Sequence, residues 1–265
     1  MRYVRILFLH FQDVFESRGR AFVWFLTITI YPLLLILFWS GASSKKPLGN
    51  GWNLSLITSY YFFLTVAFSL LISHVEEGVS KIDIREGMLV AYLLRPFSYY
   101  WKKFFEELTA RVFQSVYAVV FCLVVVIILR RNIFVITHDP ALLLMSTFLI
   151  IGAVMLSFTI KMTMGICTFW FLDIRGSYEV MYMIEMIFSG LLMPLIFLPS
   201  FFQKIAYLLP FSYIVYFPVS AILGRLSMVN LIEIFLAQMV WLASVGLIYH
   251  FLWIAGVRKF SAVGQ

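Results

Sequence analysis

The chain has 265 residues, of which 63% are hydrophobic and 12% charged, and this balance excludes a soluble globular domain because too little polar surface is left to face water. The formal net charge of +7 would suit nucleic-acid binding in a soluble chain, but in so apolar a chain it is typical of cytoplasmic loops rich in Lys and Arg, and we expect no nucleic-acid partner. Cys122 and Cys167 lie in apolar runs without a C-x-x-C pattern, which indicates two small buried residues rather than a metal site.

Residues 1–20 alternate apolar positions at helical spacing with charged ones, which predicts a helix lying in the cytoplasmic interface. Six apolar runs follow, and a run of about 20 residues is enough to cross a hydrocarbon core of about 30 Å as a helix. The six predicted spans are residues 21–42, 54–73, 112–129, 141–172, 180–198 and 231–255. The sequence therefore predicts an all-α polytopic membrane protein with one transmembrane domain over residues 1–265.

The segment 199–230, between the fifth and sixth runs, is apolar but interrupted. Pro199, Pro210, Pro218 and Gly224 break it at intervals too short for a straight span. The pattern predicts a pair of short re-entrant or interfacial helices at the outer face.

The distribution of Lys and Arg predicts the topology. With the N-terminus inside, 13 of the 20 basic residues fall in cytoplasmic segments and six in outer ones. This bias places both termini in the cytoplasm. The largest polar cytoplasmic segment is then residues 74–111, which holds as many acidic as basic residues, so a soluble partner would engage the chain there.

Several catalytic motifs are missing from the sequence. It contains no G-x-x-x-x-G-K-[ST], so this chain has no P-loop with which to bind nucleotide phosphates. H-E-x-x-H and G-x-S-x-G are also missing, and the four histidines lie in separate segments. We therefore expect no catalytic residue, no metal site and no cofactor of its own.

The cytoplasmic segment carries a family resemblance. It reads I-x-x-G-x-L at Ile84–Leu89 and Y-L-L-R-P-F-S at Tyr92–Ser98, similar to the loop between spans two and three of type-2 ATP-binding-cassette exporter permeases. The narrower likeness is to permeases of roughly this length that occur as two different permease chains with one ATPase chain. Three later stretches resemble the same pattern: Ser189–Pro194, the motifs within Leu209–Pro218, and Phe260–Gly264.

The resemblance implies a permease driven by a separate cytoplasmic ATPase, which would bind the ATP and Mg²⁺. It implies a second permease chain, related or identical, in a prokaryotic plasma membrane, and export of a lipophilic or amphipathic substrate. It also implies a short coupling helix between spans two and three. Residues 74–86 independently combine mixed charge with apolar positions at helical spacing, as a helix that docks in a partner's groove does; a solvated loop is the plain alternative. The predicted coupling residues are Val75, Glu76, Glu77, Val79, Ile82, Arg85, Glu86, Gly87, Arg95 and Pro96.

Two ionisable residues lie inside predicted spans, Lys161 in the fourth and Glu185 in the fifth. Each costs on the order of 3 kcal/mol if left unpaired in hydrocarbon. They lie 12 residues before and 12 residues after Asp173 in the turn between the two helices, so they reach similar depth. Mutual neutralisation, snorkelling of Lys161 and a place on the substrate path are all compatible with this spacing. Pro194 is the third residue assigned to the translocation path.

Two rival functions are compatible with the composition. A membrane-embedded lipid-modifying enzyme would need several polar residues around one aqueous cavity. A secondary transporter or channel would favour internal repeats or helices broken at mid-membrane, and the sequence shows no repeat.

Overall fold

The computed structural model describes residues 18–43, 51–129, 135–171 and 174–260, and within these ranges every regular element is a helix. Four helical stretches are long and apolar enough to cross a membrane, and a bent pair of short helices would make a fifth: Leu54–Arg85, Tyr99–Val125, Pro140–Phe169 and Met228–Lys259, with Ser200–Leu208 plus Pro210–Ile222 as the pair. The predicted all-α membrane class is confirmed. The count of six spans stays a prediction, and most of the predicted interfacial helix over residues 1–20 lies outside the described ranges.

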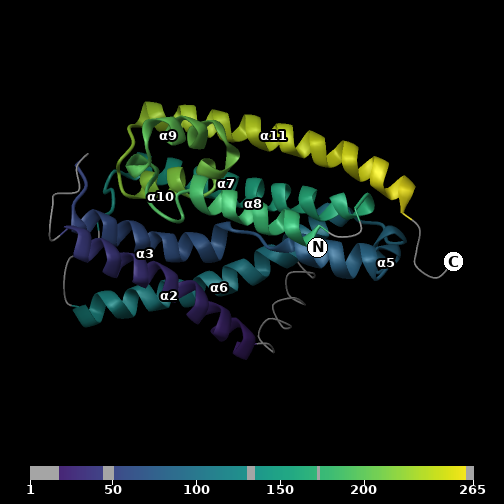
Figure 1. Cartoon of the computed structure of the whole chain (residues 1–265), viewed down its shortest axis with the longest axis horizontal. Helices are drawn as coiled ribbons and strands as arrows, with labels where there is room; N and C mark the ends of the chain where they lie inside the picture. The colour runs from purple at the N-terminus through teal and green to yellow at the C-terminus, as the bar shows by residue number, and fades with distance from the viewer. Residues whose placement is uncertain (1–17, 44–50, 130–134, 172–173, 261–265) are drawn as a thin grey trace.

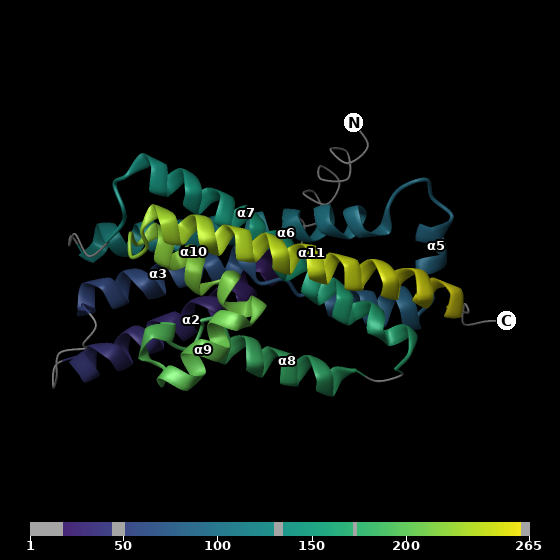
Figure 2. The ribbon, with the colours of Figure 1, turned by 90° about the horizontal axis from the view of Figure 1, so that it is seen from above.

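Six helices form the body of the molecule and run mainly along its long axis (Figure 1). They are α2 (Arg18–Ser43), α3 (Leu54–Leu71), α6 (Tyr99–Leu129), α7 (Pro140–Ile166), α8 (Arg175–Phe188) and α11 (Met228–Lys259). Helix α11 packs along α7, and α3 packs against both α2 and α6. The two views agree that α5 (Leu89–Leu93) and α9 (Ser200–Leu208) lie toward opposite ends of the long axis (Figures 1 and 2).

Local sequence explains where three of these helices begin. The side chains of Asn53, Asp139 and Ser227 each accept a hydrogen bond from a backbone N–H in the first turn of the helix that follows. These N-caps satisfy donors that have no partner within the helix. Pro140 adds to the cap of α7, because a proline at the first helical position has no N–H to leave unpaired.

Helix α6 joins part of the predicted cytoplasmic segment to the predicted third span. It starts at Tyr99, so the charged stretch before residue 111 and the apolar run 112–129 form one helix. The charges are tolerated because they pair along the helix: Lys102 with Glu106, and Arg111 Nε with Glu107 Oε1 at 2.8 Å.

The predicted fifth span differs from the structure. Helix α8 begins at Arg175 and ends at Phe188, so the expectation of an unbroken helix to Leu198 is corrected. The cause is Gly190, whose φ of +91° lies in the left-handed region that glycine adopts without strain. Tyr60 donates a hydrogen bond to the Gly190 carbonyl at 2.7 Å and fixes this turn against α3. With 14 residues, α8 is about 21 Å long, shorter than the hydrocarbon core.

The segment after this turn folds into short helices around the prolines. They are η3 (Leu195–Phe197), α9, η4 (Pro210–Tyr213) and α10 (Tyr216–Ile222), and the chain bends by 72° between α9 and the η4–α10 stretch. The short helices predicted for residues 199–230 are present, and their membrane position stays a prediction. Their apolar residues join α3 in the largest buried cluster of the described chain.

Candidate functional site

Lys161 holds two carboxylates in the interior of the protein. Its Nζ lies 2.8 Å from Glu185 Oε2 on α8 and 3.6 Å from Glu76 Oε1 on α4 (Val75–Gly78). Lys161 is 3% exposed and Glu185 1%. The two residues predicted at similar depth are thus in contact, and Lys161 is buried among protein side chains. Glu76, predicted as a coupling residue, is the third member of this cluster, and its contact with Lys161 was not predicted.

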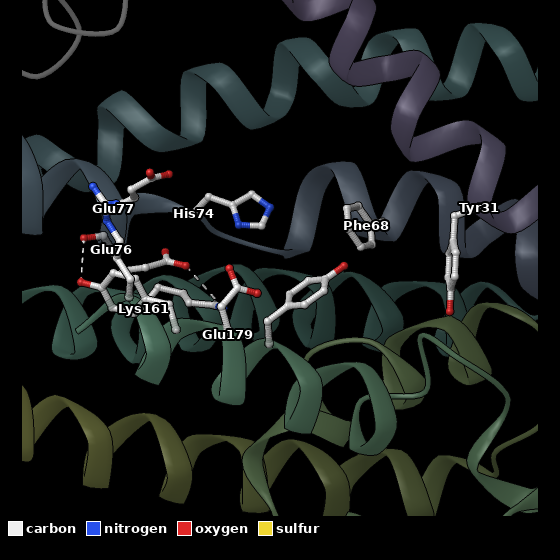
Figure 3. A pocket seen from close by; sticks show the side chains of 10 residues that line it. Tyr31, Phe68, His74, Glu76, Glu77, Lys161 and Glu179 are labelled. Atoms are coloured by element: carbon white, nitrogen blue, oxygen red, sulfur yellow. Dashed lines mark hydrogen bonds and ion pairs between the residues drawn. The ribbon is translucent and has the colours of Figure 1, made fainter. Parts of the chain in front are cut away.

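A cavity of about 610 Å³ opens beside this cluster (Figure 3). We call it the Lys161 cavity. Its aromatic lining comes from α2, α3 and α8, and consists of Tyr31, Phe68, Tyr178 and Tyr182. Its polar lining comes from the link between α3 and α4 and from α4, α7 and α8, and consists of His74, Glu76, Glu77, Lys161, Arg175 and Glu179. A cavity of this size can hold a drug-sized molecule.

The polar corner between α3 and α4 is anchored to α6. Glu107 Oε1 accepts hydrogen bonds from the Ser73 hydroxyl at 3.1 Å and from the His74 backbone N–H at 3.0 Å. The same oxygen accepts from Arg111 Nε at 2.8 Å, so the carboxylate is held by an ion pair as well. This contact fixes the start of α4 and hence the position of Glu76 at the cavity.

The predicted coupling segment is helical, but its apolar residues do not all face outward. Val75 and Val79 are buried and pack inward, whereas Ile82 is about half exposed. The reason is Gly165 on α7: a Cβ there would lie 2.9 Å from the Val79 side chain, so the missing side chain lets η1 (Val79–Arg85) approach closely. The expectation that Val75 and Val79 present themselves to a partner is therefore corrected.

The exposed part of the segment forms an apolar patch with charged residues at its edge. We call it the α5 patch, and its exposed members are Lys81, Ile82, Glu86, Met88, Val90, Leu93, Leu94, Arg95 and Pro96. Gly87, with φ of +78°, makes the turn between η1 and α5. Helix α5 ends at Leu93 and α6 begins at Tyr99, so Arg95-Pro96 lies in the turn between them. Arg85 is half-buried beneath the patch.

Asp83 connects the coupling segment to two long helices. This fully buried carboxylate accepts a hydrogen bond from the Tyr99 hydroxyl at 2.5 Å, and its Oδ2 lies 2.6 Å from Lys103 Nζ. The Tyr99 ring stacks on Trp253 of α11 with centroids 4.9 Å apart. Burial and the nearby Asp83 carboxylate raise the pKa of Tyr92, which lies against Tyr99. Asp83 therefore links η1 to α6 directly and to α11 through the Tyr99 ring.

Asp83 is not among the coupling residues predicted from the sequence, although the sequence pattern contains a signal for it. Asp83 follows Val75 and Val79 at intervals of four residues, which places all three on one face of a helix. The prediction took Ile82 as the third apolar position instead, and Ile82 is about half exposed. Pro194 is buried at the turn after α8, where its carbonyl accepts a hydrogen bond from Phe197 N–H at 3.0 Å, and it is not part of the Lys161 cavity.

These features define a multi-pass helical membrane protein with a buried charged cluster and an exposed helical patch at one end. A family model described as "ABC-2 family transporter protein" matches residues 29–264, and the chain belongs to this family. It is a permease component of an ATP-binding-cassette (ABC) transporter, a transport subunit rather than an enzyme. A search of curated protein sequences found no match.

Proposed function

We propose that this chain is the membrane subunit of an exporter driven by a separate ATPase, and that the ATPase binds the α5 patch. The observation that carries the proposal is the patch itself. Large apolar side chains such as Leu94, 80% exposed, gather there beside charged residues, a composition typical of a surface that binds another protein. ATP and Mg²⁺ would be bound by that partner.

The contacts behind the patch supply a route for force. Movement of η1 would act on α7 through Val79 and Gly165, and on α6 and α11 through Asp83. It would also shift Glu76, which belongs to the adjoining helix α4 and contacts Lys161. The ATP cycle of the partner would in this way change the Lys161 cavity.

Sequence features support the proposed membrane orientation, the second permease chain and the class of substrate. The excess of basic residues in the predicted inner segments supports cytoplasmic termini. The resemblance supports a prokaryotic plasma membrane, a second permease chain that is related rather than identical, and export of a lipophilic or amphipathic compound. Pro194 and the Lys161–Glu185 pair would then lie along the path of the substrate.

A matched pair of substitutions tests the docking site. Leu94 is 80% exposed and directly follows α5, and Leu208 is 74% exposed and ends α9; these two helices lie toward opposite ends of the molecule (Figure 1). We expect Leu94→Asp to lose the co-purifying ATPase, because a charge in the centre of an apolar interface must be desolvated without a partner. Leu208→Asp should retain the ATPase. Loss of the ATPase in both variants, or in neither, would refute docking at the α5 patch.

A further inference from the structure

We propose that the Lys161 cavity binds an amphipathic organic cation, with the charged group beside Glu76 and Glu179 and the apolar body toward Tyr31 and Phe68. The inference rests on the proposed transport function and names the class of substrate that this chain would select.

The cavity is chemically graded along its length. Figure 3 shows Tyr31 and Phe68 at one end, Glu76, Glu77 and Lys161 at the other, and His74 between them. Tyr31 comes from the middle of an apolar helix, whereas Glu76 and Glu77 come from the break after α3. The aromatic end would thus lie deeper in the membrane than the charged end, which is the orientation of an amphiphile in a leaflet.

The charges of the lining favour a cation. Lys161 forms an ion pair with Glu185 at 2.8 Å, and this pair has no net charge. The net charge of the cavity is therefore determined by the other charged residues of its lining. These are the carboxylates of Glu76, Glu77 and Glu179 against the single guanidinium of Arg175, with His74 neutral in the formal count. An excess of carboxylates in a partly enclosed cavity attracts cations and repels anions.

Glu76 provides a second, independent observation. It is 7% exposed, and although its Oε1 lies near Lys161, its Oε2 has no hydrogen-bond partner among the described residues. A buried carboxylate oxygen left without a partner is costly, and a ligand with a positive or hydrogen-bond-donating group would remove that cost.

The aromatic lining suits the same ligand. Four aromatic rings from three helices surround the space, and the face of such a ring attracts cations, including those that cannot donate hydrogen bonds. An apolar body would bury its surface against Phe68 and Tyr31 at the same time. An anionic lipophile could bury the same apolar surface, but the carboxylates of the lining would repel its charge.

Two ions of the same shape and opposite charge test the proposal. The full chain in lipid nanodiscs is titrated with tetraphenylphosphonium and, separately, with tetraphenylborate, and the signal from empty nanodiscs is subtracted. We expect saturable binding of the cation with a Kd at least tenfold below that of the anion. Glu76→Gln should weaken cation binding at least fivefold, and so should Glu179→Gln, an exposed position whose substitution leaves the Lys161 cluster intact.

Glu233→Gln is the control, because it removes the same charge from an exposed position on α11 outside the cavity. Equal binding of the two ions, tighter binding of the anion, no saturable binding of the cation, or equal effects of Glu233→Gln and Glu179→Gln would each overturn the proposal. The titration needs no ATPase. A failure here is therefore distinguishable from a failure of the proposed function, which is read from ATPase co-purification.

Discussion

Replacement of Lys161 by Met should be among the most damaging single changes in this protein. The lysine is the cation shared by Glu185 at 2.8 Å and Glu76 at 3.6 Å, and all three side chains are buried. Lys161→Met leaves two buried carboxylates without compensation, and breaking a buried ion pair in this way costs about 3–5 kcal/mol. Glu185→Gln leaves Lys161 with Glu76 as a partner, so we expect a smaller loss of about 1–3 kcal/mol.

The free energy of unfolding can be measured by SDS titration in mixed micelles, followed by tryptophan fluorescence. We expect the order of stability wild type, Glu185→Gln, Lys161→Met. The triple variant Lys161→Met/Glu76→Gln/Glu185→Gln should recover most of the loss, because it removes every charge of the cluster together. Glu233→Gln on exposed α11 serves as the control and should unfold like wild type.

A Lys161→Met variant as stable as wild type, or a triple variant no more stable than Lys161→Met alone, would show that Lys161 does not stabilise the protein by neutralising the two carboxylates. Charge exchange gives an independent check. Lys161→Glu and Glu185→Lys should each lose folded protein in the membrane, and the double exchange should restore part of it.

Three further outcomes follow from the contacts behind the patch and at the α8 turn. Asp83→Asn keeps the shape of the side chain but loses the ion pair with Lys103. The ATPase should still bind, whereas substrate-stimulated ATP hydrolysis should fall severalfold. Unchanged stimulation would count against force transmission through Asp83. Gly165→Leu should separate η1 from α7 and cost about 1–3 kcal/mol in the same SDS titration, whereas Gly176→Ala, with open space around it, should cost far less. Gly190→Ala should cost at least about 1–2 kcal/mol, because φ there is +91° and a Cβ would lie 2.6 Å from the Tyr60 hydroxyl; an alanine variant as stable as wild type would contradict backbone strain.

The sequence predicts the long helices well because their signals are local. Apolar runs of the right length give α3, α7 and α11, and Asn53, Asp139 and Ser227 mark where they begin. The contact between Lys161 and Glu185 could also be predicted, since equal distance from one turn puts two residues at the same depth. The contact between Glu76 and Lys161 could not be predicted, because it depends on how the chain turns after α3.

The errors share a cause, which is that burial depends on packing between distant segments. The spacing of Val75 and Val79 predicts an apolar surface for a partner. In the structure both are buried, because Gly165, far along the chain, lets η1 pack against α7. The predicted fifth span runs through Gly190, which is unremarkable in an apolar run but is held at a positive φ beside Tyr60. The cavity could not be predicted at all, since its lining comes from five separate segments.

If this permease works in a complex with a separate ATPase, intact-mass analysis of the native assembly should reveal both kinds of chain. The chain is purified in mild detergent together with the products of its neighbouring genes. We expect an assembly of two permease chains with two P-loop ATPase subunits. A chain that elutes alone, or with lipid only, would contradict it.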